Sequence, residues 1–364
     1  MKLLQKYLLE KGLDCAIFAT YEKVNPNLFY LTEYVGAGFL VVLANGKLML
    51  HVPSRDLSLA KKVKGVTVSS GKKLSEVLSS NGISVKKAGI DFSNISVLDF
   101  NNLKEKLKCD VKASDDSLSI SKTMDSQSFC DFVDLTEFMN GLRMVKSKEE
   151  VVKIQEACRI TDLIITKFVN NFKTFKTEKE AGAFLVYEAT KLAEGVSFEP
   201  IVASGANAAI PHHKSLDVMN NGFCVVDFGV KYKGYCSDVT RTFYVGKPSV
   251  AEEKIYYDLL EAQKKAIGLV KPGVVISDLC IDAEKDLKQK LIHSLGHGLG
   301  IEVHEMPYVS TDNKTTLIEG MVITIEPGEY IEGKYGIRIE DDVLVTSSGC
   351  EVLSKFRKEL IIIK

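Results

Sequence analysis

Acidic residues lie in a stretch of the sequence whose pattern predicts a β-hairpin. Residues 222–242 form two β-rich arms around a short polar turn, with Asp227 in the first arm and Asp238 in the second. Arms of this kind on either side of a polar turn are typical of hairpins. If the turn centres between Tyr232 and Lys233, the two aspartates fall directly opposite each other.

The same pattern recurs further along the chain with glutamates. Glu326 stands two residues before a glycine, as Asp227 does, and Glu340 stands four residues after a glycine, as Asp238 does. A hairpin centred on Gly333 would place Glu326 opposite Glu340. A repeated site element of this kind indicates two related halves.

Opposed acids in these hairpins need something to offset their repulsion. Side chains directly opposite each other have Cβ atoms about 5 Å apart, so two carboxylates there repel unless a cation or a shared proton intervenes. The alternative is two ordinary exposed hairpins. The neighbouring residues argue against it, because acids within apolar runs are costly unless paired or metal-bound; these neighbours include Val225, Val226, Ile323, Ile325 and Ile339.

Histidines lie in the same part of the chain as the acids. Five of the six histidines are in this region: His212, His213, His293, His297 and His304. Glycines around His297 predict a loop or strand that lets the backbone approach a ligand closely. One imidazole with four carboxylates suits Mn²⁺, Co²⁺, Fe²⁺ or Zn²⁺. Two ions are favoured over one, because two divalent cations neutralise four negative charges.

Composition predicts a soluble protein of two domains. The chain has 364 residues, 45% of them hydrophobic and 26% charged, with a net charge of -1 and no block of like charge. This composition favours neither nucleic acid nor an anionic membrane as a partner, and no apolar window is long enough to span a membrane. Eight scattered cysteines without a C-x-x-C motif predict free thiols in a reducing cytoplasm, with a Cys224–Cys236 bridge as the alternative.

The first part of the chain, residues 1–135, alternates helix and strand patterns. It predicts an α/β domain with a mixed sheet. Its one histidine is His51, and it contains no catalytic constellation. We expect a lid, oligomerisation or substrate-gating domain, in which residues 114–128 form a loop or a weak connector.

The second domain, residues 140–364, has the order helix, helix, hairpin, repeated once. Three helices are predicted to begin at Ser147, Thr177 and Ser249, the first two at capping-box patterns, and a fourth covers residues 277–291. Two similar halves would bring the acid hairpins together about a pseudo-two-fold axis, so that their four acids face one cavity.

Five motifs, in this order, give the chain a resemblance to a known family: SGANAAIPHH, VVDFG with GYCSDVTRT, HSLGHGLGIEVHE, TIEPGEY and GIRIED. The chain resembles the pita-bread metallopeptidases, the clan of methionyl aminopeptidases, aminopeptidase P and prolidase. The phrase LRMVKSKEE looks like the entry to their catalytic domain. The resemblance implies an α/β (α+β) fold. A creatinase-like N-terminal domain (1–135) would precede a pita-bread catalytic domain (140–364) with a pseudo-two-fold internal repeat.

The resemblance also implies a ligand set for two metal ions. Asp227 would chelate one ion, and His297 and Glu326 would hold the other. Asp238 and Glu340 would bridge both ions. A metal-bridging hydroxide would then attack the scissile carbonyl, with Glu326 accepting the proton.

Other residues would handle the substrate in such an enzyme. His212 and His304 resemble the histidines that bind substrate and stabilise the tetrahedral intermediate. His293 resembles the additional histidine of the Xaa-Pro branch, or it only lines the pocket. Arg338 is similar to the arginine that orients the substrate or its carboxylate, or it only pairs with a site carboxylate. His213 is expected to be structural.

The resulting hypothesis is a cytoplasmic metallo-exopeptidase of the prolidase type that cleaves Xaa-Pro dipeptides. Two divalent ions per chain, Mn²⁺ or Co²⁺ foremost with Zn²⁺ or Fe²⁺ as alternatives, would be its cofactors, and proline-containing peptides its substrates. The resemblance suggests a homodimer. The second hypothesis is an aminopeptidase P that acts on longer Xaa-Pro peptides. A binding protein that keeps the fold is the third, but no metal ligand is missing from the motifs.

Overall fold

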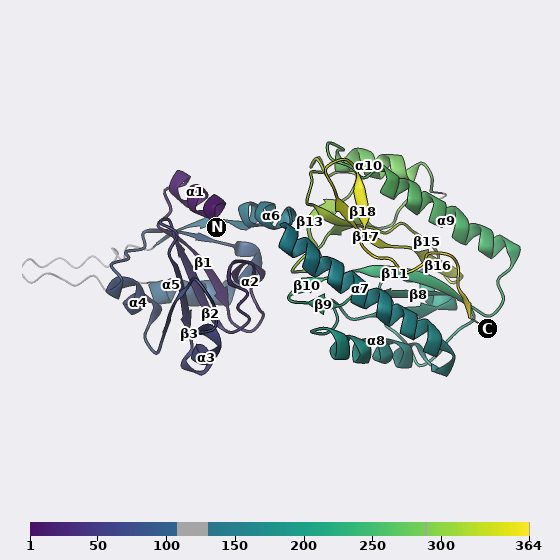
Figure 1. The fold of residues 1–364 in the computed structure, drawn as a ribbon, viewed down its shortest axis with the longest axis horizontal. Coiled ribbons are helices and arrows are strands. Elements are labelled where there is room, and N and C mark those ends of the chain that lie inside the picture. The colour runs from purple at the N-terminus through teal and green to yellow at the C-terminus, as the bar shows by residue number, and fades with distance from the viewer. Residues whose placement is uncertain (108–129, 288–289, 364) are drawn as a thin grey trace, which may run out of the picture. The chain divides into compact units, whose positions relative to one another are not determined.

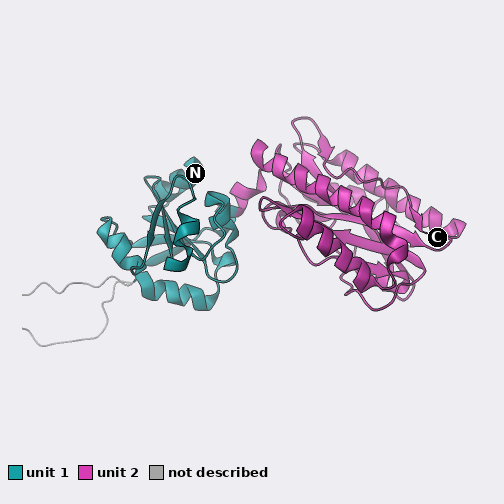
Figure 2. Cartoon of the chain, turned by 60° about the horizontal axis from the view of Figure 1, so that its bottom comes forward, with its two compact units in different colours: residues 1–139 teal, residues 140–364 magenta. Residues whose placement is uncertain are grey.

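Two compact units make up the chain in the computed structural model, which describes residues 1–107, 130–287 and 290–363. Unit 1 is Met1–Met139 and unit 2 is Asn140–Lys364 (Figure 2). The predicted connector at residues 114–128 lies outside the described residues. None of the described helices is long and apolar enough to cross a membrane.

Unit 1 contains the mixed sheet that the sequence predicts. The strand order is β4-β3-β2-β1-β5-β6, with antiparallel pairs among β1 to β3 and parallel pairs at both edges. The strands are β1 Cys15–Thr20, β2 Gly38–Leu43, β3 Leu48–Val52, β4 Thr67–Ser70, β5 Lys87–Ile90 and β6 Asp131–Asp134. The helices are α1 Lys2–Glu10, α2 Pro26–Thr32, α3 Leu57–Ala60, α4 Leu74–Ser80 and α5 Val97–Leu107, and α6 Thr136–Met144 leads into unit 2.

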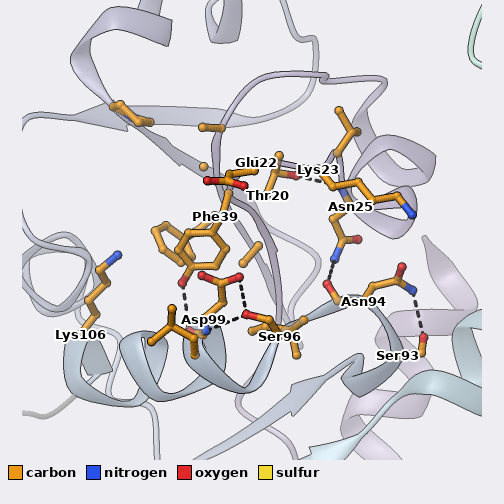
Figure 3. A pocket seen from close by; sticks show the side chains of 18 of the residues that line it. Thr20, Glu22, Lys23, Asn25, Phe39, Ser93, Asn94, Ser96, Asp99 and Lys106 are labelled. Atoms are coloured by element: carbon orange, nitrogen blue, oxygen red, sulfur yellow. Dashed lines mark hydrogen bonds between the residues drawn. The ribbon is translucent and has the colours of Figure 1, made fainter.

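Several polar groups around a large hollow in unit 1 bond to one another. The hollow has a volume of about 910 Å³ and lies beside the segment that follows β1 (Figure 3). In its wall, Asn25 Nδ2 donates to Asn94 O at 3.3 Å, and Ser96 Oγ donates to Asp99 Oδ2 at 2.7 Å. Lys106 Nζ lies 4.8 Å from the Phe39 ring centre. The wall therefore gives no indication of a catalytic site.

Unit 2 repeats the predicted order of two helices followed by strands. The first half contains α7 Lys148–Asn171, α8 Glu178–Leu192, β7 Ile201–Ser204, β8 Gly222–Phe228, β9 Lys231–Tyr232, β10 Tyr235–Cys236 and β11 Val239–Val245. The second half contains α9 Val250–Leu269, α10 Ile276–Glu284, β12 Gly296–Gly298, β13 Glu305–Val309, β14 Val322–Ile325, β15 Gly328–Ile331, β16 Tyr335–Arg338, β17 Asp341–Val345 and β18 Cys350–Val352. Strand β19 Ile362–Ile363 pairs with β11.

Each helix pair of unit 2 covers one sheet (Figure 1). Helices α7 and α8 bury Phe168 and Leu185 against Val226 of the sheet β19-β11-β8-β7. Helices α9 and α10 bury apolar residues such as Leu279 against Ile323 of the sheet β13-β12-β14-β17-β18. Burial of this apolar surface fixes the two sheets, and the acid-bearing segments extend from them.

The helix boundaries follow the predicted caps, except at α10. Ser147 and Ser249 form complete capping boxes with the glutamates three residues later, and the Thr177 side chain accepts from the Glu180 amide. Helix α10 ends at Glu284, so the predicted extension to residue 291 is wrong. Leu287 and Leu291, which lie beyond this end, pack against different hydrophobic clusters.

The first acid hairpin has a different register from the predicted one. Strand β11 pairs with β8 so that Thr240, not Asp238, lies opposite Asp227. The turn centres one position later, because Lys233 and Gly234 take the positive φ angles of 47° and 79° that a tight hairpin turn requires. The corrected register puts Asp238 diagonal to Asp227 on the same face, because side chains alternate with a period of two.

The second acid hairpin has the predicted register. Strands β14 and β17 pair Ile325 with Asp341, and β15 and β16 pair Gly328 with Arg338, which is one register centred on Gly333. Glu326 and Glu340 lie between these two ladders, at positions that face each other. Among the described cysteines all thiols are free, so the alternative bridge between Cys224 and Cys236 is not formed.

Candidate metal centre

A single cavity in unit 2 collects all nine candidate site residues. Its volume is about 390 Å³, and its lining includes Asp227, Asp238, His297, Glu326, Glu340, His212, His293, His304 and Arg338. The acids come from strand ends or from breaks between strands, and His297 comes from the middle of β12. Side chains at strand ends can converge on one point, because the ladder no longer holds them apart.

Three of these residues are close enough to hold one cation. Asp238, His297 and Glu340 are buried, and each offers a ligand atom within 4.8 Å of the others; no other such group occurs among the described residues. His297 Nε2 lies 3.5 Å from Asp238 Oδ2 and 3.3 Å from Glu326 Oε1. Asp227 and Glu326 line the same cavity.

Crowding of the carboxylates perturbs their protonation. Burial, followed by the charges of Glu340 and Asp227, raises the pKa of Asp238 well above its usual range. Burial and the charge of Glu326 raise the pKa of Glu340 in the same way. Burial acts on Glu326 too, but its hydrogen bond and charge interaction with His297 outweigh it and lower the pKa to about 2. The site thus stores repulsion that protons or cations must offset.

The site leaves carboxylate oxygens that divalent cations would satisfy. Asp227 Oδ1 and Asp238 Oδ1 are buried and accept no hydrogen bond from the described residues. A buried acceptor without a hydrogen-bond partner costs roughly 1–3 kcal/mol, and an ionised one costs more. Carboxylates with one imidazole are ligands for divalent transition metals. The residues present therefore fit the metal ions that the sequence predicts.

Two threonines that sequence analysis missed orient the acids. Thr240 Oγ1 donates to Glu340 Oε2 at 2.5 Å, and Thr324 Oγ1 donates to Glu326 Oε1 at 3.0 Å. Thr324 Oγ1 also accepts the His297 amide at 3.0 Å. Each threonine stands two residues from an acid in the sequence, which places both on one face of a strand. That spacing is a signal that could have identified them.

Arg338 is bonded to an acid of the cavity. Its NH2 donates to Asp227 Oδ2 at 2.7 Å, its NH1 donates to the Tyr330 hydroxyl at 2.8 Å, and its Nε donates to Thr240 Oγ1 at 3.1 Å. The residue is 4% exposed. The guanidinium thus has several partners within the site, which favours the second of the two roles left open by the sequence. Tyr330, a cavity neighbour, was also missed.

The histidines differ in their surroundings. The His304 ring lies 4.3 Å from the His297 ring, and His293 Nε2 lies 3.1 Å from the Tyr330 hydroxyl. Burial lowers the pKa of both His293 and His304, so the neutral imidazole predominates at neutral pH. His212 is exposed at the cavity wall. His213 points elsewhere, because its Nε2 lies 2.8 Å from Glu178 Oε2.

Asp342, which the sequence analysis did not identify, binds the backbone of the candidate ligand Asp238. Its Oδ2 accepts the Asp238 amide at 3.0 Å and the Cys158 thiol at 3.1 Å. Burial raises its pKa to about 7. No sequence pattern distinguishes Asp342 from the adjacent Asp341, whose carboxylate binds Arg241 and Lys358.

Comparison with known proteins agrees with this site. The pattern of "Metallopeptidase family M24" matches residues 152–347, and that of "Creatinase/Prolidase N-terminal domain" matches residues 1–145. The chain belongs to metallopeptidase family M24. The predicted pita-bread family, its fold class and the prediction of a metallo-exopeptidase are thereby confirmed. Membership of M24 implies divalent metal ions.

Individual relatives cover nearly the whole of this M24 chain. It is 34% identical over 373 residues to an Xaa-Pro dipeptidase of Pyrococcus horikoshii, covering 99% of this chain and 98% of the relative. The crystal structure of the prolidase from P. horikoshii OT3 superimposes with a TM-score of 0.85 at 32% identity and 99% coverage of both chains. The X-Pro aminopeptidase of Thermotoga maritima superimposes with a TM-score of 0.86 at 30% identity, covering 99% of this chain and 100% of that one.

Metal binding to this M24 protein should depend on pH, because metal replaces protons. Since the pKa values of Asp238 and Glu340 are raised in the metal-free fold, their contribution to stability is present at low pH. This contribution is lost as the pH rises through the pKa values that the two carboxyl groups have in the folded protein. At a fixed Mn²⁺ concentration about 100 times the Kd at pH 8, we therefore expect the unfolding temperature to rise by roughly 5–10 °C at pH 8 and by less at pH 6.

Thermal unfolding with and without Mn²⁺ at the two pH values measures this difference. Glu340→Gln is the matched variant, because it removes one titrating bridging candidate without changing side-chain size. Equal stabilisation of the wild-type protein at both pH values would contradict the proton-for-metal exchange.

Proposed function

We propose that this M24 peptidase hydrolyses the bond before proline in Xaa-Pro dipeptides. The observation that carries the proposal is the cavity of about 390 Å³ in which the five candidate metal ligands meet the histidines and Arg338. Full-length similarity to an Xaa-Pro dipeptidase supports it. The volume is at the lower end of small-molecule sites, which suits a short peptide.

Five residues would hold two divalent ions in this proposal. Asp227 would ligate one ion, His297 and Glu326 the other, and Asp238 and Glu340 both. When bound, such ions lower the pKa of a water molecule and polarise the scissile carbonyl. Mn²⁺ or Co²⁺ is our first expectation for their identity. The cytoplasmic location and the homodimer remain predictions.

Glu326 is the proposed proton acceptor. Its pKa of about 2 in the metal-free site makes it an anion at neutral pH, because His297 stabilises the charge. Thr324 donates to its Oε1, so the carboxylate has a fixed orientation while its other oxygen remains available. A base must be ionised and positioned to take a proton, and Glu326 meets both conditions.

His212 and His304 are proposed to bind the substrate and stabilise the oxyanion. The lowered pKa of His304 favours a neutral ring, which can donate one N–H without competing for the metal carboxylates. Phe198, Ile201 and Tyr308 contribute apolar surface to the same cavity. Such surface would contact a proline ring and exclude water from the reacting groups.

Aminopeptidase P activity is the second candidate, and one observation favours it. The X-Pro aminopeptidase of T. maritima is as similar in structure to this chain as the prolidase is. The two candidates differ in whether the enzyme accepts a peptide that continues beyond proline. Leu-Pro and Leu-Pro-Ala therefore distinguish them.

Proline release from Leu-Pro should require added metal. We expect turnover by metal-stripped protein only after Mn²⁺ or Co²⁺ is added, and a loss of at least about 10³-fold in Asp238→Ala, because both ions would lose a ligand. Asp286→Ala is the control, since Asp286 is an exposed acid that pairs with Lys265. Hydrolysis of Leu-Pro-Ala but not Leu-Pro by metal-loaded protein would favour the aminopeptidase. Turnover in Asp238→Ala would contradict the ligand assignment.

The role of Arg338 can be tested with the same two peptides. Because Arg338 is bonded to Asp227, we expect Arg338→Ala to lower kcat/KM for Leu-Pro and Leu-Pro-Ala by similar factors. It should also weaken metal retention during dialysis. Arg338→Lys, which keeps the charge but not the fork of donors, should recover only part of both losses. A loss confined to Leu-Pro would instead indicate that Arg338 binds the terminal carboxylate.

A further inference from the structure

Glu178 is a buried carboxylate outside the metal cavity with an unusual number of partners. It stands in the first turn of α8 and is fully buried. Five donors lie within hydrogen-bond distance of its two oxygens: Ser204 N at 2.7 Å, Ser204 Oγ at 2.8 Å, Asn207 Nδ2 at 3.0 Å, His213 Nε2 at 2.8 Å and Leu216 N at 2.9 Å. For the His213 contact, the tautomer with a proton on Nε2 makes the ring the donor.

All of these partners belong to one segment, residues 204–216, which we call the His212 loop. It begins at the last residue of β7 and includes His212 at the cavity wall. Glu178 therefore bonds to both ends of the loop and to its middle. Two backbone bonds just beside it, Glu178 N to Val218 O at 2.9 Å and Lys179 N to Leu216 O at 3.3 Å, join the loop to the start of α8.

The other side of the His212 loop rests on β16, the strand that carries Arg338. A Cβ atom added to Gly336 would lie 1.8 Å from Ala208 O, so only glycine allows this approach of the two backbones. Arg338 NH1 also lies 3.5 Å from Pro211 O. The loop is thus held between Glu178 and β16, and His212 projects from the held segment.

Glu178 is not an ordinary helix-capping acid. An acid in the first turn usually interacts with the free amides of its own helix. Here Thr177 accepts the Glu180 amide, while the Glu178 oxygens accept from the loop. Burial raises the pKa of Glu178, but the hydrogen bonds from Asn207, Leu216 and Ser204 outweigh burial and lower it. The carboxylate is therefore ionised and accepts all of its bonds.

We propose that Glu178, together with His213, is a positioning residue that holds the His212 loop so that His212 stays directed at the substrate in the metal cavity. This inference rests on the proposed peptidase function. It assigns His213, which sits next to His212, the task of linking the loop to Glu178. It predicts that changes at Glu178 act on catalysis only through His212.

A double-mutant cycle tests this dependence. Glu178→Gln keeps the side-chain size but replaces one acceptor oxygen by an NH₂ group that faces other donors. We therefore expect kcat/KM for Leu-Pro to fall about 10- to 100-fold. The metal content should not change. In a His212→Ala background the same change should add less than about 2-fold. Glu188→Gln is the matched control, because Glu188 is a buried acid on the same helix that pairs with Lys167 and Lys191 instead.

His213→Asn gives a second, milder variant if Glu178→Gln folds poorly. It removes one of the five bonds, so its smaller loss should vanish in the His212→Ala background as well. The proposal would be overturned if Glu178→Gln lowered kcat/KM by the same factor in the His212→Ala background as in the wild-type protein. It would also be overturned if Glu178→Gln alone had the kcat/KM of the wild-type protein.

Hydrogen exchange separates this proposal from the proposed function. Exchange over residues 204–216 should be faster in Glu178→Gln than in the wild-type protein and unchanged in Glu188→Gln. If wild-type protein hydrolyses neither Leu-Pro nor Leu-Pro-Ala, the proposed function fails, but exchange still decides whether Glu178 holds the loop. Unchanged exchange in Glu178→Gln would overturn the proposal whether or not the protein is a peptidase.

Discussion

Repulsion among buried carboxylates is the constraint on which unit 2 depends. Asp238 and Glu340 are 5% and 2% exposed, share a cavity with Asp227 and Glu326, and have raised pKa values. A fold that brings such groups together without cations gives up stability, because each charge loses hydration and meets like charge. The arrangement is retained where a bound ligand offsets its cost, which is why these acids indicate a metal centre and not a structural core.

Hydrogen bonds from neighbouring side chains and the packing of the helix pairs hold these acids in place. Thr240 and Thr324 fix one oxygen each of Glu340 and Glu326, and Arg338 fixes Asp227. The helix pairs pack on the opposite side of the sheets and contribute apolar burial that offsets the cost of the site.

Other buried carboxylates hold the segments that carry the histidines. Glu178 bonds the His212 loop, and Glu305, next to His304, pairs with Arg143 and Lys146. Buried carboxylates therefore serve in this unit both as candidate ligands and as anchors for loops.

Local chemistry explains how much could be predicted from the sequence. Ser147 and Ser249 predict where their helices begin, because a cap needs only residues within one turn. Gly333 likewise predicts the centre of the second hairpin. The register of the first hairpin was missed by one residue per strand, since nothing local indicates that Lys233 takes positive φ. The end of α10 depends on which cluster Leu287 and Leu291 join. Asp342 and Glu178 were not predicted because their hydrogen-bond partners lie far away in the chain, and only the fold brings them into contact.

Electron paramagnetic resonance during a Mn²⁺ titration of metal-stripped protein tests the central claim most directly. If Asp227, Asp238, His297, Glu326 and Glu340 hold two ions with shared carboxylates, the spectrum at two equivalents per chain should show exchange-coupled Mn²⁺, and Glu340→Gln should lose that coupling. Retention of a single uncoupled ion at saturation would contradict the account, as would binding that leaves Glu340→Gln indistinguishable from the wild-type protein.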